Sequence, residues 1–105
     1  MPASLDQIAF AISDPSRRRI LDSLRDSGPQ RAGDLASLFA RISRPAVSKH
    51  LRVLRSSRLI SQQRRGRELW YRLEPEPLSS VEAWLHKYED FWNARLTALK
   101  QAAEK

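Results

Sequence analysis

The sequence predicts a mainly helical fold with one β-hairpin, in the order α-α-α-α-β-β-α. Apolar residues recur at helical spacing along most of the chain, whereas the alternation typical of a strand occurs in residues 69–73. Only three Gly and six Pro occur among the 105 residues, which favours helices over loops. A chain of this length buries one modest core, so we expect residues 1–105 to form a single domain.

A clear boundary separates the first two helices. Leu5, Ile8 and Ile12 share one helical face, which predicts a short first helix. Asp14-Pro15 is typical of an N-cap followed by proline in the first turn, so a second helix begins there. Its apolar stripe ends at Gly28-Pro29, a pair that stops helices.

Two further helices follow with a tight turn between them. The apolar spacing predicts a third helix from Ala32 to near Arg41. Ser43 is a good N-cap for a fourth helix, which continues to Ser56. The hydrophobic staple at its start and its buried face are expected from Ile42, Val47, Leu51 and Leu54.

An extended pattern replaces the helical one beyond Ser56. Leu59-Ile60 opens a first strand, Arg65-Gly66-Arg67 supplies a turn, and residues 69–73 form a second strand. We therefore expect a β-hairpin with a basic tip. Glu74-Pro75-Glu76-Pro77 then interrupts regular structure.

One long helix closes the predicted fold, because apolar residues keep helical spacing from Val81 to Leu99. Its aromatic stripe is compatible with a core, a cofactor site or a subunit interface. So short a chain has little else to bury the stripe against, so we expect a homodimer held by the first and last helices. The expected interface residues are Leu5, Ile8, Ile12, Trp84, Leu85, Tyr88, Phe91 and Trp92.

Positive charge is concentrated in the middle of the chain. The net charge is +7, but residues 41–72 carry +9, since ten basic residues accompany the single acid Glu68, and the remaining residues carry −2. Such a segment is typical of a surface that binds a polyanion and releases its counterions; a solvated charged face is the alternative. The ten residues are Arg41, Arg44, Lys49, Arg52, Arg55, Arg58, Arg64, Arg65, Arg67 and Arg72.

Composition argues against several classes of protein. No Cys is present, which excludes disulfides, thiolate metal ligands and thiol catalysis. The longest apolar run, Ile8–Ile12, is far shorter than the roughly 18 residues of a membrane span, and the start MPASLDQ lacks the basic region of a signal peptide, so we expect a cytoplasmic protein. Without a Gly-rich phosphate loop or a recognisable catalytic set, we expect neither a cofactor nor enzymatic activity.

A short helix, a tight turn and a second helix with an exposed polar face describe a helix-turn-helix, and the following hairpin makes the motif winged. If Val47, Leu51 and Leu54 face the core, a basic face turns outward, where it can enter the major groove of double-stranded DNA. The expected DNA contacts of this recognition helix are Arg44, Pro45, Ser48, Lys49 and Arg52. The expected phosphate contacts of the wing are Arg64, Arg65 and Arg67.

The segments DPSRRRILDSL (14–24), SRPAVSKHLRVLR (43–55) and LISQQRRGRELWYRLEPEPL (59–78) together resemble the ArsR-type winged helix-turn-helix repressors. The resemblance covers most of the chain in the right order. It implies a homodimeric, bacterial-type repressor that competes with transcription initiation at its operator. It also implies that the first and last helices build the dimer and that the helix containing PAVSKHL contacts bases.

Two positions depart from that family pattern. Many members have Gly before the first wing strand, where this chain has Arg58, so a left-handed backbone there would be strained. Metal-sensing members place cysteines in the helix before the recognition helix, and the corresponding segment here is Arg31-Ala32-Gly33-Asp34-Leu35. The chain therefore resembles the metal-independent members, whose final helix is long and aromatic.

Histidine and carboxylates are the remaining candidates for a metal site. Glu82, His86 and Glu89 share one face of the last helix and resemble half of a site completed across a dimer, but such sets are also common on exposed helix faces. We expect no metal. His50 lies between core positions of the fourth helix, so we expect a packed or hydrogen-bonded structural histidine.

Together these features predict a dimeric, sequence-specific regulator that binds double-stranded DNA, and specifically a repressor at an inverted-repeat operator. A winged-helix module that binds proteins is the alternative from another class, because a fold does not determine a function. That use requires no basic recognition face. A ligand pocket at the dimer interface would add sensing to DNA binding.

Overall fold

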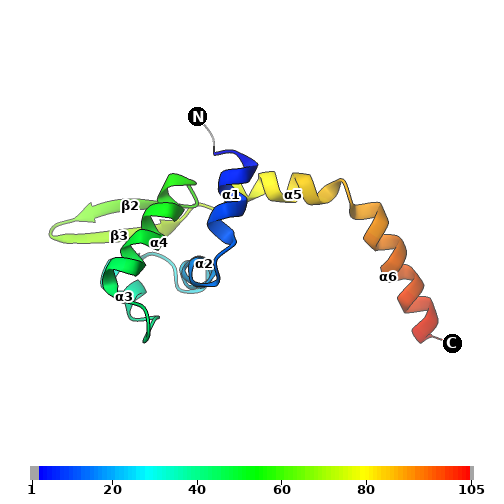
Figure 1. Ribbon diagram of the computed structural model, residues 1–105, viewed down its shortest axis with the longest axis horizontal. Coiled ribbons are helices and arrows are strands. Elements are labelled where there is room, and N and C mark those ends of the chain that lie inside the picture. Colours follow the sequence, from blue (N-terminus) through cyan, green and yellow to red (C-terminus); the bar gives the residue numbers. More distant parts are fainter. Residues whose placement is uncertain (1–2, 105) are drawn as a thin grey trace.

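Residues 3–104 are described in a computed structural model (Figure 1), so Met1 and Pro2 of the N-terminal segment considered above lie outside the described range. The predicted fold class, mainly helical with a wing, is confirmed. In chain order the elements are α1 (Leu5–Ile12), α2 (Pro15–Ser27), β1 (Gln30–Arg31), α3 (Ala32–Ala36), α4 (Arg44–Ser56), β2 (Ile60–Arg65), β3 (Glu68–Leu73), the 3-10 helix η1 (Glu76–Leu78), α5 (Ser79–His86) and α6 (Glu89–Ala103).

Helix α2 begins and ends as the sequence predicts. The Asp14 carboxylate accepts hydrogen bonds from the backbone N–H groups of Ser16 and Arg17 at 2.8 and 3.1 Å. Gly28 follows the helix with φ of 75°, and its N–H donates to the carbonyl of Leu24 at 3.0 Å. A positive φ suits Gly because it has no Cβ, so this residue closes the helix without strain.

Helix α3 is shorter than predicted, which corrects the expected end near Arg41. It stops at Ala36, and after the C-cap Ser37 the backbone bonds from Leu38 to Leu35 and from Phe39 to Ala36 span three residues rather than four. The Ser37 hydroxyl also donates to a helix carbonyl within this turn. A tightened last turn and a competing serine hydrogen bond end the helix although its apolar spacing continues.

The hairpin belongs to a three-stranded antiparallel sheet in the order β1-β3-β2, and the sequence analysis missed the two-residue strand β1. In β1, Gln30 pairs with Tyr71 and Arg31 pairs with Trp70. Strand β1 therefore joins the wing to the chain segment that leads directly into α3.

The hydrophobic core draws at least one residue from each of α1 to α4 and from the sheet. Its largest fully buried side chains are Ile8, Ile20, Leu35, Leu54 and Leu59. The remaining core members are Ala11, Leu21, Leu24, Val47, Leu51, Ile60 and Tyr71. This shared core holds α4 and the wing in a common unit.

The predicted single final helix is wrong, because the chain breaks into α5 and α6. Around the break, the N–H groups of Lys87 and Tyr88 donate to carbonyls three residues earlier, and Tyr88 has φ of −106° and ψ of 4°. No Gly or Pro marks the position, so helical spacing continues across it. Figure 1 shows α5 beside α1 and α6 extending away from the rest of the molecule.

Helix α6 (Glu89–Ala103) forms an extended arm, which makes the molecule elongated. The molecule measures 61 × 34 × 21 Å, and its radius of gyration is 17.5 Å. A globular chain of about 100 residues has a radius of gyration near 13 Å. The arm therefore lies largely outside the volume that the core fills.

Candidate nucleic-acid interface

Helix α4 is anchored to the core along one face. Its N-cap is the predicted one, because the Ser43 hydroxyl accepts a hydrogen bond from the N–H of Ala46 at 3.3 Å. Val47, Leu51 and Leu54 are buried, with exposed fractions of 3% or less. The core thus fixes the rotation of α4 about its axis, as the apolar spacing predicts.

The opposite face of α4 is exposed and basic. Arg55 in the last turn of α4 is exposed, and so are all five expected DNA contacts of this helix: Arg44, Pro45, Ser48, Lys49 and Arg52. Arginine and lysine can donate to phosphates and to guanine acceptors, and serine can donate or accept. The structure therefore brings these predicted site residues together on one surface.

The wing ends in a two-residue turn of Gly66 and Arg67, because Arg65 pairs directly with Glu68. Gly66 has φ of 65° at the first central position, an arrangement typical of a type II′ hairpin turn. The three arginines predicted for the wing, Arg64, Arg65 and Arg67, are exposed.

Neighbouring wing arginines project from opposite faces of the hairpin, since side chains alternate along a strand. Arg65 shares its face with Trp70, and its Cζ atom lies 4.7 Å from the centroid of the indole ring. Arg64 lies on the other face, opposite Leu69 in the strand register. The wing therefore presents positive charge on both sides of its tip.

The exposed basic side chains of α4 and of the wing tip keep their positive charge, because the salt bridges of the described residues lie elsewhere. Within residues 3–104, the arginines in salt bridges are Arg25, Arg31 and Arg72, and no salt bridge engages the exposed cations of α4 or of the wing tip. Arg72 donates to Glu74 at 2.8 Å. This hydrogen bond, together with one from Ser61, lowers the pKa of Glu74. Acidic partners thus neutralise Arg72 at the base of the wing but not the tip.

Comparisons with known proteins agree with this geometry. Residues 14–62 match the family model described as bacterial regulatory protein, arsR family. The transcriptional repressor SdpR of Bacillus subtilis is 40% identical over 77% of this chain and 88% of its own length. The HTH-type transcriptional regulator Rv2034 of Mycobacterium tuberculosis is 37% identical over 93% of this chain and 87% of its own length. The chain belongs to the ArsR family.

A solved structure supports the same assignment for the fold. An ArsR-like transcriptional regulator from Rhodococcus sp. RHA1 has 36% sequence identity and a TM-score of 0.73, over 95% of this chain and 90% of its own. The protein is therefore an ArsR-family transcriptional regulator with a winged helix-turn-helix, and these relatives do not favour a protein-interaction module.

This ArsR-family chain has the strained residue that the sequence analysis expected. Arg58 has φ of 63°, the only positive φ of a non-glycine residue within residues 3–104. Its N–H donates to the carbonyl of Arg55 at 3.0 Å, and the next residue, Leu59, is fully buried. Arg58 thus takes the left-handed conformation that reverses the chain between α4 and β2, where Gly would be unstrained.

The sequence analysis missed two arginines that link elements. Arg31 joins Asp34 and Glu68 through ion pairs at 3.1 and 2.9 Å. Arg17 is only 7% exposed and donates to the backbone carbonyls of Phe10 and Ala11. Hydrophobic periodicity does not reveal such links. For Arg31, the one signal in the sequence was its partner Glu68, the single acid in the basic segment.

The predicted interface residues fall into two groups. On α5 and α6 and in the break between them, the side chains of Trp84, Leu85, Tyr88, Phe91 and Trp92 are exposed in the single chain. On α1, Leu5 and Ile12 are half-buried, but Ile8 is fully buried in the core of the single chain. The assignment of Ile8 to a subunit interface is corrected, because a side chain without exposed surface has none to bury against a partner.

The carboxylate and histidine set of the last helix is split by the helix break. Nδ1 of His86 lies within hydrogen-bond distance of a carboxylate oxygen of Glu89 across the break. Within the described part of the chain, no group of three or more His, Asp or Glu side chains is placed to hold a metal ion. Nor is any helix in that part long and apolar enough to cross a membrane.

Proposed function

We propose that the protein is a homodimeric transcriptional repressor that binds double-stranded DNA at an inverted-repeat operator. The observation that carries this proposal is the exposed basic face of α4, whose cations have no acidic partners within residues 3–104. Its relative SdpR is named a transcriptional repressor, which supports repression. On this proposal the protein acts in the cytoplasm as one non-enzymatic domain, without a metal or cofactor.

Recognition is divided between α4 and the wing. Ser48, Lys49 and Arg52 project from one face of a helix whose rotation the core fixes, so they suit base edges in the major groove. The wing arginines lie on a hairpin tip, where contact with phosphates requires less positional accuracy. The helix would thus supply sequence specificity, and the wing would add affinity.

Dimerisation is supported by the apolar surface on α5 and α6. In the protomer, Phe91, Leu96 and Leu99 are 61, 61 and 67% exposed. Large contiguous apolar surfaces mark interaction sites, and most soluble oligomers are two-fold symmetric. A second copy of the chain would cover this surface and place two α4 helices on one side of the DNA.

Selection of bound sites from a pool of random duplexes tests the proposal. The expected product is an inverted repeat whose half-sites lie about 34 Å apart, or a multiple of that spacing, because two symmetric helices must meet successive major grooves. Fluorescence anisotropy at two salt concentrations then compares the selected duplex with a random duplex. Failure to bind any duplex at low salt would reject DNA binding and favour the protein-interaction alternative.

A further inference from the structure

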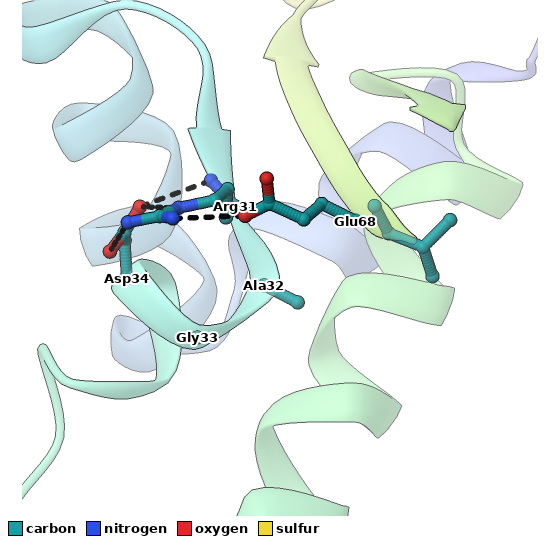
Figure 2. A pocket seen from close by; sticks show the side chains of 6 residues that line it. Arg31, Ala32, Gly33, Asp34 and Glu68 are labelled. Atoms are coloured by element: carbon teal, nitrogen blue, oxygen red, sulfur yellow. Dashed lines mark hydrogen bonds and ion pairs between the residues drawn. The ribbon is translucent and has the colours of Figure 1, made fainter. Parts of the chain in front are cut away.

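We propose that Arg31 is a positioning residue that holds the wing against helix α3 by bridging Asp34 and Glu68. The inference rests on the proposed function, because a positioned wing matters for contact with DNA. Figure 2 shows the Arg31 side chain extended between the two carboxylates. The three residues line a shallow pocket between the start of α3 and the wing.

The two ends of the bridge lie on different elements. On α3, Asp34 accepts from Nε of Arg31 at 3.1 Å, and this hydrogen bond lowers the pKa of Asp34. On β3, Glu68 accepts from Nη1 of Arg31 at 2.9 Å. The guanidinium also lies 5.9 Å from the ring centroid of Trp70. Nη2 of Arg31 also donates to the other carboxylate oxygen of Asp34 at 3.4 Å, so one side chain contacts one residue of α3 and two of the wing.

The bridge begins where backbone pairing ends. Strand β1 stops at Arg31, which pairs with Trp70, and the chain then turns into α3. Glu68 lies two residues closer to the wing tip than Trp70, beyond the reach of β1 backbone bonds. The Arg31 side chain thus extends the attachment of β3 toward the tip, next to Arg65 and Gly66.

The two possible roles of Glu68 predict opposite changes in DNA affinity when its charge is removed. Glu68 is the only acid in the segment 41–72, so its negative charge opposes the binding of phosphates. If Glu68 were only a charge, Glu68→Gln would strengthen binding to every duplex. If Glu68 anchors Arg31, the same substitution loosens the wing and weakens binding to the selected duplex.

Two variants and a control separate these outcomes. Glu68→Gln breaks the wing end of the bridge, and Arg31→Lys keeps the net charge but replaces the planar fork with a single ammonium. Both side chains are about half exposed, so the fold should survive both changes. Glu76→Gln in η1 makes the same change of charge at an exposed residue outside the basic segment.

Two measurements are made on the full chain. Amide hydrogen exchange of residues 62–72 in the free protein should be faster in Glu68→Gln and Arg31→Lys by about threefold, and unchanged in Glu76→Gln. In anisotropy titrations, both bridge variants should bind the duplex selected from the random pool about three- to fivefold more weakly, the size expected of exposed ion pairs.

The proposal requires both results. Unchanged exchange in the wing, or stronger binding of Glu68→Gln to selected and random duplexes alike, would overturn it. If the unmodified protein binds no duplex, the proposed function fails, and hydrogen exchange alone then decides whether Arg31 holds the wing.

Discussion

Arg17 of α2 and His50 of the recognition helix α4 lie side by side, with Nη1 and Nδ1 3.4 Å apart. Arginine only donates, so this contact is a hydrogen bond when the imidazole proton is on Nε2. The nearest carboxylate oxygen of Asp14 lies 4.0 Å from the same Nδ1. His50 is half-buried, and its contacts are those of the predicted structural histidine. Through Arg17, the end of α1 is joined to α4.

Replacing Arg17 should destabilise the fold. Arg17→Met leaves the carbonyls of Phe10 and Ala11 without their charged donor, and we expect the free energy of unfolding to fall by about 2 kcal/mol. Urea denaturation checks this value. Arg18→Met is the matched control, because Arg18 also donates to a helix carbonyl but is exposed, and its effect should stay within about 0.5 kcal/mol. Equal effects of the two changes would contradict the structural role of Arg17.

Substitutions on α4 should reduce sequence specificity. We expect Arg52→Ala or Ser48→Ala to weaken binding to the selected duplex by about 1 to 3 kcal/mol and to change random-duplex binding much less, because the proposed function places these side chains against base edges. Anisotropy titrations give both affinities. Arg25→Ala, at an arginine paired with Asp22 and Asp26, controls for charge. An unchanged ratio of the two affinities would show that another element reads the bases.

Substitutions in the wing should reduce affinity without altering specificity. Arg67→Ala at the turn should weaken binding to selected and random duplexes by the same factor, since phosphates are common to both. The slope of log affinity against log salt should flatten by about one unit for each phosphate that each subunit no longer neutralises. A salt series with both duplexes measures this slope. Loss of specificity with an unchanged slope would instead assign base reading to the wing.

Truncation of the exposed aromatic residues should dissociate the dimer and spare the protomer. Phe91 and Trp92 are 61 and 39% exposed in the protomer, so Phe91→Ala and Trp92→Ala remove little from its core. Loss of a large aromatic buried at an interface costs roughly 3 to 5 kcal/mol. Light scattering at micromolar concentration should show a dimer for the unmodified protein and for Lys100→Ala, and a monomer for the aromatic variants. A monomeric unmodified protein would refute the interface.

Metal ions should not change DNA affinity. The chain has no cysteine, and His86 pairs with Glu89 rather than joining a cluster of three ligands within the described residues. Titrations of the selected duplex with and without zinc, cadmium or arsenite should therefore coincide. A tenfold loss of affinity that His86→Ala abolishes would show that this face binds metal.

Local chemistry made most of the fold predictable. The N-caps Asp14 and Ser43 marked two helix starts, and the stripe of Val47, Leu51 and Leu54 indicated which face of α4 is outward. The remainder depends on contacts that periodicity does not encode. Strand β1 has only two residues, and the break at Tyr88 has neither Gly nor Pro to mark it.

For the candidate site, the sequence predicted which residues are exposed but not which side chains contact one another. Exposure on α4 and on the wing follows from spacing, so Arg52 and Arg67 lie on the surfaces expected of them. The bridging role of Arg31 depends on a carboxylate 37 positions away, which only the folded sheet brings near. Ile8 shares a helical face with Leu5, and spacing alone did not distinguish the protomer's core from a subunit interface.

If the chain dimerises as proposed, the α6 arm would connect the lifetime of the protein in the cell to its assembly. Phe91, Leu96 and Leu99 on this arm are more than half exposed in the single chain, and Trp92 is 39% exposed. In that case newly made chains would expose this apolar surface to chaperones and proteases until a second copy covered it. Unpaired copies would therefore be removed first, and the pool that survives would be enriched in assembled molecules.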